Sequence, residues 1–171
     1  MLEFIIGGIR SGKSRYAEWL AQESNFEVYY IATCKSIDND LKYRIKNHRK
    51  RRPLFWNLIE EPIDIEKIII KFDNKKKIFI IDCLTLWINN NLFYNPNTIK
   101  FKCIEIIKLL KYIKGRILII STEIGEGIIP INKLSRKYID IIGEFHQQIT
   151  FLVDRVWSLC SGIPKLIKYN L

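Results

Sequence analysis

Residues 7–14 have the residue types and the spacing of a phosphate-binding loop. Gly7 is followed by four residues and then by Gly12-Lys13-Ser14, which fits the pattern G-x-x-x-x-G-K-[ST]. In such a loop the glycines let backbone N–H groups turn toward phosphate oxygens, the lysine adds positive charge, and the hydroxyl offers a ligand to Mg²⁺. An apolar run precedes the loop and the helical pattern SRYAEWLAQ follows it. We therefore predict a nucleotide phosphate site here rather than an ordinary glycine-rich turn.

An acidic residue closes a second apolar run. Residues 78–82 read IFIID, and Asp82 stands where phosphate-loop proteins place the carboxylate that holds a metal-bound water. An acid at the end of a strand is common, and Asp82 could instead cap the helical segment CLTLWINNNL that follows it. Taken together with the loop, Asp82 and Ser14 are interpreted as the metal-site residues.

The third candidate is His48, one of two histidines, which directly precedes the basic residues at 49–52. Neutral imidazole is abundant near pH 7 and is a good nucleophile for phosphorus. Neighbouring cations favour that neutral form and offset charge on a transferred phosphoryl group. The residues alone leave two other interpretations: a solvated surface histidine, or a nucleic-acid surface on which bases stack on Phe55 and Trp56. The phosphate loop in the same chain favours nucleotide chemistry.

Composition limits the class of protein. The chain has 171 residues, 48% of them hydrophobic, which suits one globular domain covering residues 1–171. Its net charge of +10 suits a polyanionic ligand: a nucleotide, nucleic acid or an anionic membrane. No apolar run reaches the roughly 18 residues of a membrane span, and no secretory signal is visible, so we expect a cytoplasmic protein. The four cysteines form no C-x-x-C pair, which argues against a zinc site, and Cys103 and Cys160 are expected in the core.

The elements that would position these residues alternate along the chain. Short apolar runs rich in isoleucine predict strands at 2–6, 27–32, 78–82, 116–121 and 155–160, with a less certain strand at 53–60. Spacings of three and four predict a long helix at 131–152, and Pro62 suits the first turn of a helix at about 63–72. The turn SGIP and the residues KLIK after it predict an antiparallel edge strand. We expect a three-layer α/β fold like that of P-loop NTPases, with a mostly parallel sheet and helices on both faces.

Six segments, in order from residue 4 to about 168, resemble successive blocks of the adenosylcobinamide kinase / adenosylcobinamide-phosphate guanylyltransferase family. They are GGIRSGKSRYAE, YIATC, RIKNHRKRRPLFWNLIEEP, DCLTLWINNNL, STEIGEGIIPINKLSRKYIDIIGEFHQQI and DRVWSLCSGIPKLIK. The segment H-R-x-R-R-P at 48–53 and the loop E-x-G-x-G-I-x-P at 123–130 are much more specific than the phosphate loop.

The resemblance implies a bifunctional enzyme of cobalamin assembly. It would phosphorylate the aminopropanol hydroxyl of adenosylcobinamide with ATP or GTP. It would then transfer GMP from GTP to adenosylcobinamide phosphate through a guanylylated histidine, giving adenosylcobinamide-GDP and pyrophosphate. His48 corresponds to that histidine, and the resemblance also implies Mg²⁺ and a homotrimer. The nucleotide contacts it implies are Gly7, Gly8, Ile9, Arg10, Ser11, Gly12, Lys13, Ser14, Ala32, Thr33, Cys34, Arg49, Lys50, Arg51, Arg52, Glu60 and Asp82.

Three positions depart from the family pattern. Thr122 stands where an Asn is usual, His146 replaces an Asn on the long helix, and Leu41 replaces a common Met. The first two could alter the corrinoid pocket or the kinase half. Two other classes stay open: a small-molecule kinase or NTPase that uses only the phosphate loop, and a nucleic-acid-binding protein favoured by charge alone. We expect no nucleic-acid partner.

Overall fold

A computed structural model describes residues 1–34 and 52–169. His48, Arg49, Lys50, Arg51 and Leu41 lie outside the described residues. Strands and helices alternate along most of the described chain. Their bounds are β1 Leu2–Gly7, α1 Lys13–Gln22, β2 Glu27–Ala32, β3 Asn57–Glu60, α3 Ile65–Phe72, β4 Lys77–Asp82, α4 Leu84–Tyr94, α5 Ile99–Leu110, β5 Arg116–Thr122, α6 Lys133–Leu152, β6 Arg155–Cys160 and β7 Ile163–Tyr169.

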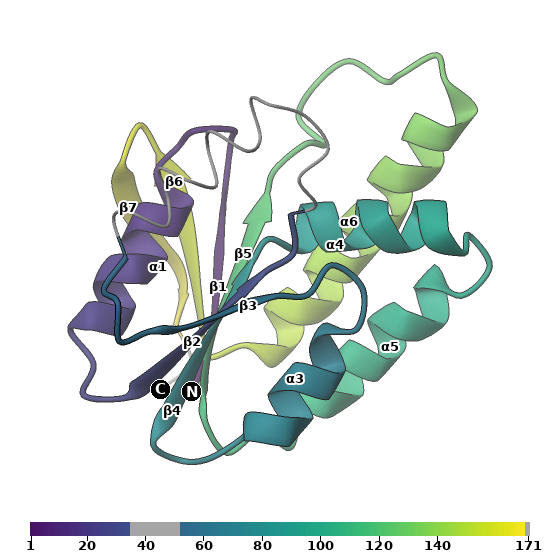
Figure 1. Cartoon of the computed structure of the whole chain (residues 1–171). Helices are drawn as coiled ribbons and strands as arrows, with labels where there is room; N and C mark the ends of the chain where they lie inside the picture. The colour runs from purple at the N-terminus through teal and green to yellow at the C-terminus, as the bar shows by residue number, and fades with distance from the viewer. Residues whose placement is uncertain (35–51, 170–171) are drawn as a thin grey trace.

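The strands form one sheet in the order β3-β2-β4-β5-β1-β6-β7. All neighbouring pairs are parallel except β6 and β7, which form an antiparallel hairpin at one edge. The predicted α/β class, the mostly parallel sheet and the antiparallel C-terminal edge strand are confirmed. Parallel pairing brings the carboxyl ends of β1, β2, β4 and β5 to one edge of the sheet, and the phosphate loop follows β1 at that edge (Figure 1).

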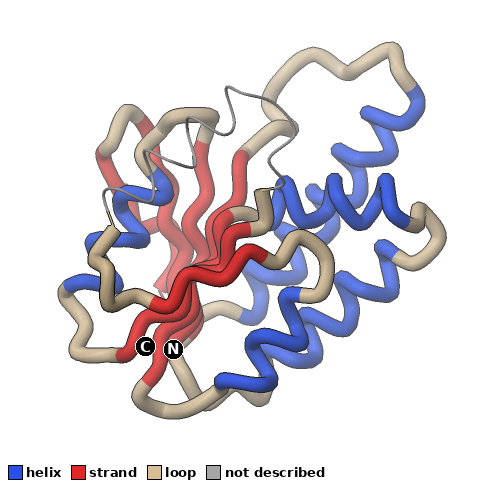
Figure 2. Tube along the Cα trace, viewed as in Figure 1, coloured by secondary structure: helices blue, strands red, loops and turns tan. Residues whose placement is uncertain are grey.

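Helices cover the two faces of the sheet unequally. The helices α3, α4, α5 and α6 pack on one face, whereas α1 lies on the other (Figures 1 and 2). Alternating strand residues supply the two cores. Tyr29 and Ile31 of β2 join the core beneath α3–α6, and Val28 and Tyr30 join the core beneath α1. This period of two explains why the strands are apolar almost throughout.

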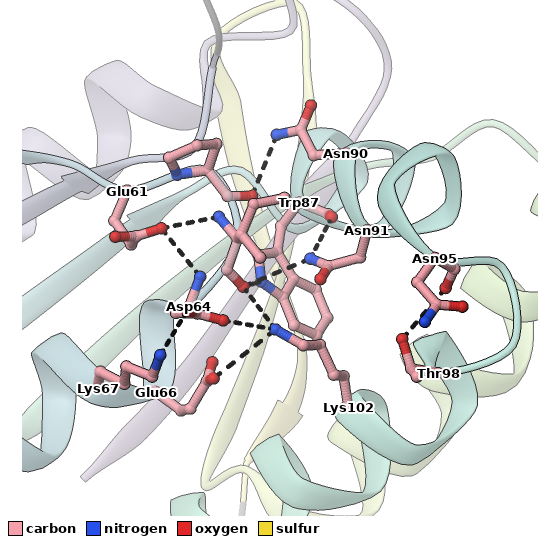
Figure 3. Close-up of polar contacts among 12 residues, drawn as sticks. Glu61, Asp64, Glu66, Lys67, Trp87, Asn90, Asn91, Asn95, Thr98 and Lys102 are labelled. Carbon is pink, nitrogen blue, oxygen red and sulfur yellow. Dashed lines mark hydrogen bonds and ion pairs between the residues drawn. The ribbon is translucent and has the colours of Figure 1, made fainter.

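A polar cluster lies inside the α3–α6 layer, around the backbone carbonyl of Ile63 in the loop between β3 and α3. The indole Nε1 of Trp87 donates to this carbonyl at 2.7 Å, and Lys102 Nζ reaches it at 3.4 Å. Lys102 Nζ also donates to Asp64 Oδ1 at 2.6 Å, and Asn91 Nδ2 lies 3.5 Å from the same carbonyl (Figure 3). We call Asp64, Trp87, Asn91 and Lys102 the loop anchor, because they tie the loop after β3 to α4 and α5.

Three predicted elements begin later than expected, and two of them lie before β4. The strand expected at 53–60 is confined to Asn57–Glu60, because Pro53 has no N–H to donate and the Trp56 N–H closes a turn on the Pro53 carbonyl at 3.1 Å. The helix expected from residue 63 begins at Ile65. Glu61 Oε1 accepts the N–H groups of residues 63 and 64, both at 2.9 Å, so Pro62 lies in the preceding loop rather than in the first turn.

The long helix α6 begins two residues later than predicted. Asn132 caps it, accepting the N–H groups of Leu134 and Ser135 at 2.8 and 3.1 Å. Cys103 is buried as expected, whereas Cys160 is exposed, because it lies at the turn of the edge hairpin β6–β7. Within residues 1–34 and 52–169, no helix combines the length and the apolar character needed to cross a membrane.

Candidate active site

The phosphate loop turns sharply between β1 and α1. Ser11 N donates to the Gly8 carbonyl at 3.2 Å, and the Gly162 N–H from the β6–β7 turn donates to the Ser11 carbonyl at 2.9 Å. The edge hairpin therefore supports the loop from outside. Lys13 and Ser14 open the first turn of α1, where unpaired backbone N–H groups favour anions.

Two glycines of the loop are required by geometry. A Cβ at Gly7 would lie 2.3 Å from the Leu159 carbonyl oxygen, which no real Cβ tolerates. Gly12 has φ +98° and its Cβ would lie 3.1 Å from Gly162 Cα, so a side chain there would be both strained and crowded. The glycines at the two ends of the motif thus let the loop pass close to the β6–β7 hairpin.

Lys13 is buried and points back into its own loop. Its Nζ donates to the carbonyls of Gly7 and Gly8 at 2.9 and 2.6 Å. Burial lowers the pKa of Lys13, while the nearby Cys83 and the Asp82 carboxylate act in the opposite direction. The negative charge of Asp82 at the end of β4 therefore acts on the Lys13 ammonium, as is expected where phosphate and metal share one site.

Four side chains contact one another in a row that starts on α1 and ends at Asp82. The Tyr30 hydroxyl donates to Asp82 Oδ2, and the Arg52 guanidinium carbon lies 3.5 Å from the centroid of the Tyr30 ring. Arg52 Nε also pairs with Glu18 Oε1 at 3.0 Å, with both side chains less than 10% exposed. Burial and then Asp82 raise the pKa of Tyr30 well above its usual value, so its hydroxyl keeps the proton that it donates. We call Glu18, Arg52, Tyr30 and Asp82 the carboxylate clamp.

The other predicted contacts lie at the neighbouring strand ends. Ala32 ends β2 and pairs with Asp82 of β4 on one side and with Glu60 of β3 on the other. Thr33 follows, and its Oγ1 accepts the Cys83 N–H and donates to the Cys83 carbonyl, both at 2.8 Å. Ala32, Thr33, Cys34 and Glu60 are thus brought to the edge that carries Lys13 and Asp82, with the exposed Glu60 on the outermost strand, β3.

The end of β5 lies between the phosphate loop and Asp82. Thr122 N donates to Thr85 Oγ1 at 2.7 Å, and Glu123 N donates to the Gly7 carbonyl at 3.0 Å. Beneath this point, Ser121 Oγ lies 3.0 Å from Thr85 Oγ1 and 2.7 Å from His146 Nε2. Burial lowers the pKa of His146 to about 4, so the buried imidazole is neutral near pH 7.

Sequence patterns alone did not identify several residues at this edge. Glu18 could have been noticed as a charged residue beside Ala17 and Ala21 on the buried side of α1. Tyr30 lies in an apolar strand and carries no sequence signal of its own, because a buried tyrosine is a common core residue. Glu123 lies just beyond a predicted strand, whereas Asp82 is the last residue of one.

These residues fit a nucleotide and a hard divalent cation. Ser11 Oγ is buried and has no hydrogen-bond partner among the described residues, so the loop holds a donor that phosphate oxygens could satisfy. The Ser14 hydroxyl at the start of α1 and the Asp82 carboxylate at the end of β4 are oxygen ligands on the same edge of the sheet. A pair of oxygen ligands from the protein, completed by phosphates and water, is the usual environment of Mg²⁺.

Several solved structures have a similar fold. A protein of Pyrococcus horikoshii matches with a TM-score of 0.60 at 9% identity, over 99% of this chain and 87% of that one. The RadB recombinase matches with a TM-score of 0.54 at 11% identity, over 92% and 73%. An ATPase of a bacterial type III secretion system matches with 0.53 at 13% identity, over 92% and 50%. At these identities the likeness shows the fold alone.

Sequence comparison gives the family. The family model described as cobinamide kinase / cobinamide phosphate guanyltransferase matches residues 3–167. The bifunctional adenosylcobalamin biosynthesis protein CobP of Pseudomonas aeruginosa is 38% identical over 98% of both chains. The bifunctional adenosylcobalamin biosynthesis protein CobU of Escherichia coli is 31% identical over 98% of this chain and all of its own. The chain belongs to the cobinamide kinase / cobinamide phosphate guanyltransferase family.

Proposed function

We propose that this protein catalyses two successive reactions of cobalamin assembly. The first transfers a phosphoryl group from ATP or GTP to the aminopropanol hydroxyl of adenosylcobinamide. The second transfers GMP from GTP to the resulting phosphate, giving adenosylcobinamide-GDP and pyrophosphate. The observation that carries the proposal is the family match over residues 3–167, which includes a phosphate loop built as that chemistry requires.

In both reactions the phosphate loop binds the triphosphate. Backbone N–H groups of residues 8–14 and the start of α1 bind its oxygens, and Lys13 exchanges the carbonyls of Gly7 and Gly8 for phosphate. Ser14 and Asp82 would hold Mg²⁺, partly through water, and the bound ion neutralises charge on the phosphates. Ala32, Thr33, Cys34 and Glu60 complete the nucleotide site from the adjacent strand ends.

The guanylyl transfer proceeds through His48. Its neutral imidazole attacks the α-phosphorus of GTP, a P–N bond forms, and the bond to the bridging oxygen breaks with release of pyrophosphate. Cobinamide phosphate then takes the GMP from the histidine. In this proposal Arg49, Lys50 and Arg51 bind the phosphates during the transfer. Arg52 is assigned to the nucleotide site by the family resemblance, and its guanidinium stacks on Tyr30 beside Asp82.

The test is a covalent adduct of defined stability. The protein is incubated with Mg²⁺ and with GTP labelled at the α-phosphate, and bound GMP is measured by intact mass and by label. A phosphoramidate is lost in mild acid, so the adduct should be acid-labile and absent in His48→Ala. The variant should still phosphorylate adenosylcobinamide, because that step needs no such intermediate. An acid-stable adduct, or one that persists in His48→Ala, would identify a different nucleophile. A protein that forms no adduct with GTP but still phosphorylates small molecules would be the kinase or NTPase considered as the alternative.

We also propose one catalytic domain over residues 1–171, a cytoplasmic location and a homotrimer. The family resemblance supports the trimer, and the dependence of both reactions on nucleotide triphosphates supports the location. Light scattering at working concentration should give three times the chain mass of 20.3 kDa. A monomer would remove the trimer without affecting the two activities.

A further inference from the structure

Glu123 lies beside the phosphate loop, but its carboxylate has no role in phosphate binding. Its backbone N–H donates to the Gly7 carbonyl at 3.0 Å, and Lys13 Nζ donates to the same oxygen at 2.9 Å. A negative side chain at this edge of the sheet repels a triphosphate. A carboxylate at such a place therefore suggests work on a proton or on a metal rather than on phosphate.

The backbone and the side chain of Glu123 are both held in place. On one side Thr122 N is tied to Thr85 Oγ1 at 2.7 Å, above the buried contacts of Ser121. On the other side Glu123 Oε1 accepts the Gly125 N–H at 2.7 Å, and a Cβ at Gly125 would lie 3.1 Å from that oxygen. The glycine leaves room for this rotamer, and the contacts limit how far the carboxylate moves. Such positioning is what general acid–base catalysis needs.

The other described carboxylates at this edge are less suited to accept a proton from an acceptor hydroxyl. Asp82 already accepts from Tyr30 and is the proposed metal residue. Glu60 ends β3, which β2, β4 and β5 separate from β1 in the sheet. Glu123, by contrast, follows β5, which lies directly between β4 and β1.

The loop that begins with Glu123 also suits the acceptor. It runs from residue 123 to Asn132 beyond the carboxyl end of β5 (Figure 1), and it exposes the side chains of Ile128, Ile129 and Ile131. An apolar surface on a loop that starts beside the phosphate loop favours a large organic acceptor over water. The hydroxyl of that acceptor would then meet Glu123 at the base of the loop.

We propose that Glu123 is the general base of the phosphorylation step, an inference that rests on the kinase activity proposed above. The acceptor hydroxyl oxygen attacks the γ-phosphorus, and its proton passes to the Glu123 carboxylate. The bond between the γ-phosphorus and the bridging oxygen breaks, and the nucleoside diphosphate leaves with the electron pair. The carboxylate then releases the proton to solvent. The guanylyl transfer does not use this base, because its attacking groups, an imidazole and a phosphate, are nucleophiles without losing a proton.

The test compares Glu123→Gln with Glu126→Gln, a change of the same kind at an exposed position of the same loop. Gln keeps an oxygen acceptor for the Gly125 N–H, so the turn is retained. We expect Glu123→Gln to lower kcat for phosphorylation by about 100-fold or more, while Glu126→Gln stays within about 2-fold of the unaltered protein. GMP adduct formation, transfer to supplied cobinamide phosphate, and the Mg²⁺ concentration for half-maximal nucleotide binding should stay unchanged in both variants.

Two further measurements separate a base from a structural or metal-binding role. Glu123→Asp keeps a carboxylate and should retain more kinase activity than Glu123→Gln, and the acidic limb of the pH–kcat profile should disappear in the Gln variant. Glu123 is not the base if the Gln variant phosphorylates at the normal rate. The same conclusion follows if Asp and Gln are equally inactive, or if nucleotide binding and both reactions decline together. If the unaltered protein does not phosphorylate adenosylcobinamide at all, it is the proposed kinase function that fails.

Discussion

Polar side chains are buried on both faces of the sheet, but they hold different kinds of group in place. Beneath α3–α6, the loop anchor directs Trp87, Asn91 and Lys102 at one backbone carbonyl, that of Ile63 (Figure 3). Beneath α1, the carboxylate clamp directs Tyr30 at a side chain, the carboxylate of Asp82. Fixing a carbonyl determines the path of the chain, whereas fixing a carboxylate determines where a chemical group lies.

We therefore expect substitutions in the two clusters to have different effects. Residues of the loop anchor should affect the free energy of unfolding and leave the affinity of the folded protein for nucleotide unchanged. Residues of the carboxylate clamp should affect metal-dependent nucleotide binding more than stability. One connection between the two regions is Asn90, whose Nδ2 donates to the Thr33 carbonyl at 2.8 Å and to the Pro62 carbonyl at 3.2 Å. It joins the loop after β2 to the loop after β3.

The largest effect should come from Lys13, whose Nζ lies in the phosphate loop and contacts the carbonyls of Gly7 and Gly8. Lys13→Ala removes the cation that both reactions use, so each should be slowed by about 1000-fold or more. Phosphorylation and GMP adduct formation are measured separately, with thermal unfolding to confirm the fold. Normal guanylyl transfer by this variant would show that a second nucleotide site exists. The site beside the carboxylate clamp would then not serve both reactions.

The next largest effect is a pH dependence of the unfolding free energy, caused by a histidine on the α3–α6 face. Burial holds the pKa of His146 at about 4, against 6.5 in the unfolded chain. Above pH 6.5 both states are neutral. Between pH 6.5 and 4 only the unfolded chain takes up the proton, so stability falls as the pH is lowered, by up to about 3 kcal/mol.

Urea unfolding of the protein and of His146→Asn at pH 7 and pH 4.5 measures this contribution. The change in unfolding free energy between the two pH values should be about 2 to 3 kcal/mol smaller in the variant, because Asn does not titrate. Equal changes in both proteins would mean that His146 is protonated in the folded state, and the buried contact with Ser121 would need revision.

Much of this arrangement is predictable from sequence, and the failures have physical reasons. The loop at 7–14, the strand that ends in Asp82 and the edge hairpin follow from local patterns of glycine, apolar runs and turns. The clamp does not, because Glu18, Arg52, Tyr30 and Asp82 are far apart in the chain and meet only when β2 pairs with β4 and α1 crosses them. Helix α5 was also not singled out, although its buried residues Ile99, Cys103, Ile106 and Leu110 follow a helical spacing.

Local chemistry also displaced two predicted boundaries. Pro62 resembles the first residue of a helix, but the Glu61 carboxylate takes the next two N–H groups and delays the helix to Ile65. The residues before Asn57 read as a strand because they are apolar, yet Trp56 folds back on Pro53 and buries its ring beneath α1. In both cases a hydrogen bond that the apolar pattern does not encode decided the outcome.

A smaller effect should separate the loop anchor from an ordinary surface pair. Lys102→Met removes a cation that is 18% exposed and bonded to Asp64 at 2.6 Å, so we expect a loss of about 1 to 2 kcal/mol of unfolding free energy. Lys100→Met is the matched control, because its pair with Glu144 is 3.5 Å long and mostly exposed, and it should change stability by less than about 0.5 kcal/mol. Nucleotide affinity should stay unchanged in both variants. Equal stability losses would mean that the loop anchor holds no more than a surface ion pair does.

The smallest effect is the sharpest test of the carboxylate clamp. Tyr30→Phe removes one hydroxyl and keeps the ring beneath Arg52, so packing and the stacked guanidinium are retained. Without its donor, the Asp82 carboxylate is free to rotate, and a metal–nucleotide complex must fix it on binding. We therefore expect GTP affinity in the presence of Mg²⁺ to fall by about 5- to 10-fold, about 1 to 1.4 kcal/mol. Affinity measured with EDTA should not change. Tyr29→Phe is the matched control, because the Tyr29 hydroxyl contacts Glu27 and Lys77 at the opposite end of the strands, away from the phosphate loop. If Tyr30→Phe weakens binding equally with and without Mg²⁺, the hydroxyl supports the fold of the site rather than the metal carboxylate, and the distinction between the two faces disappears.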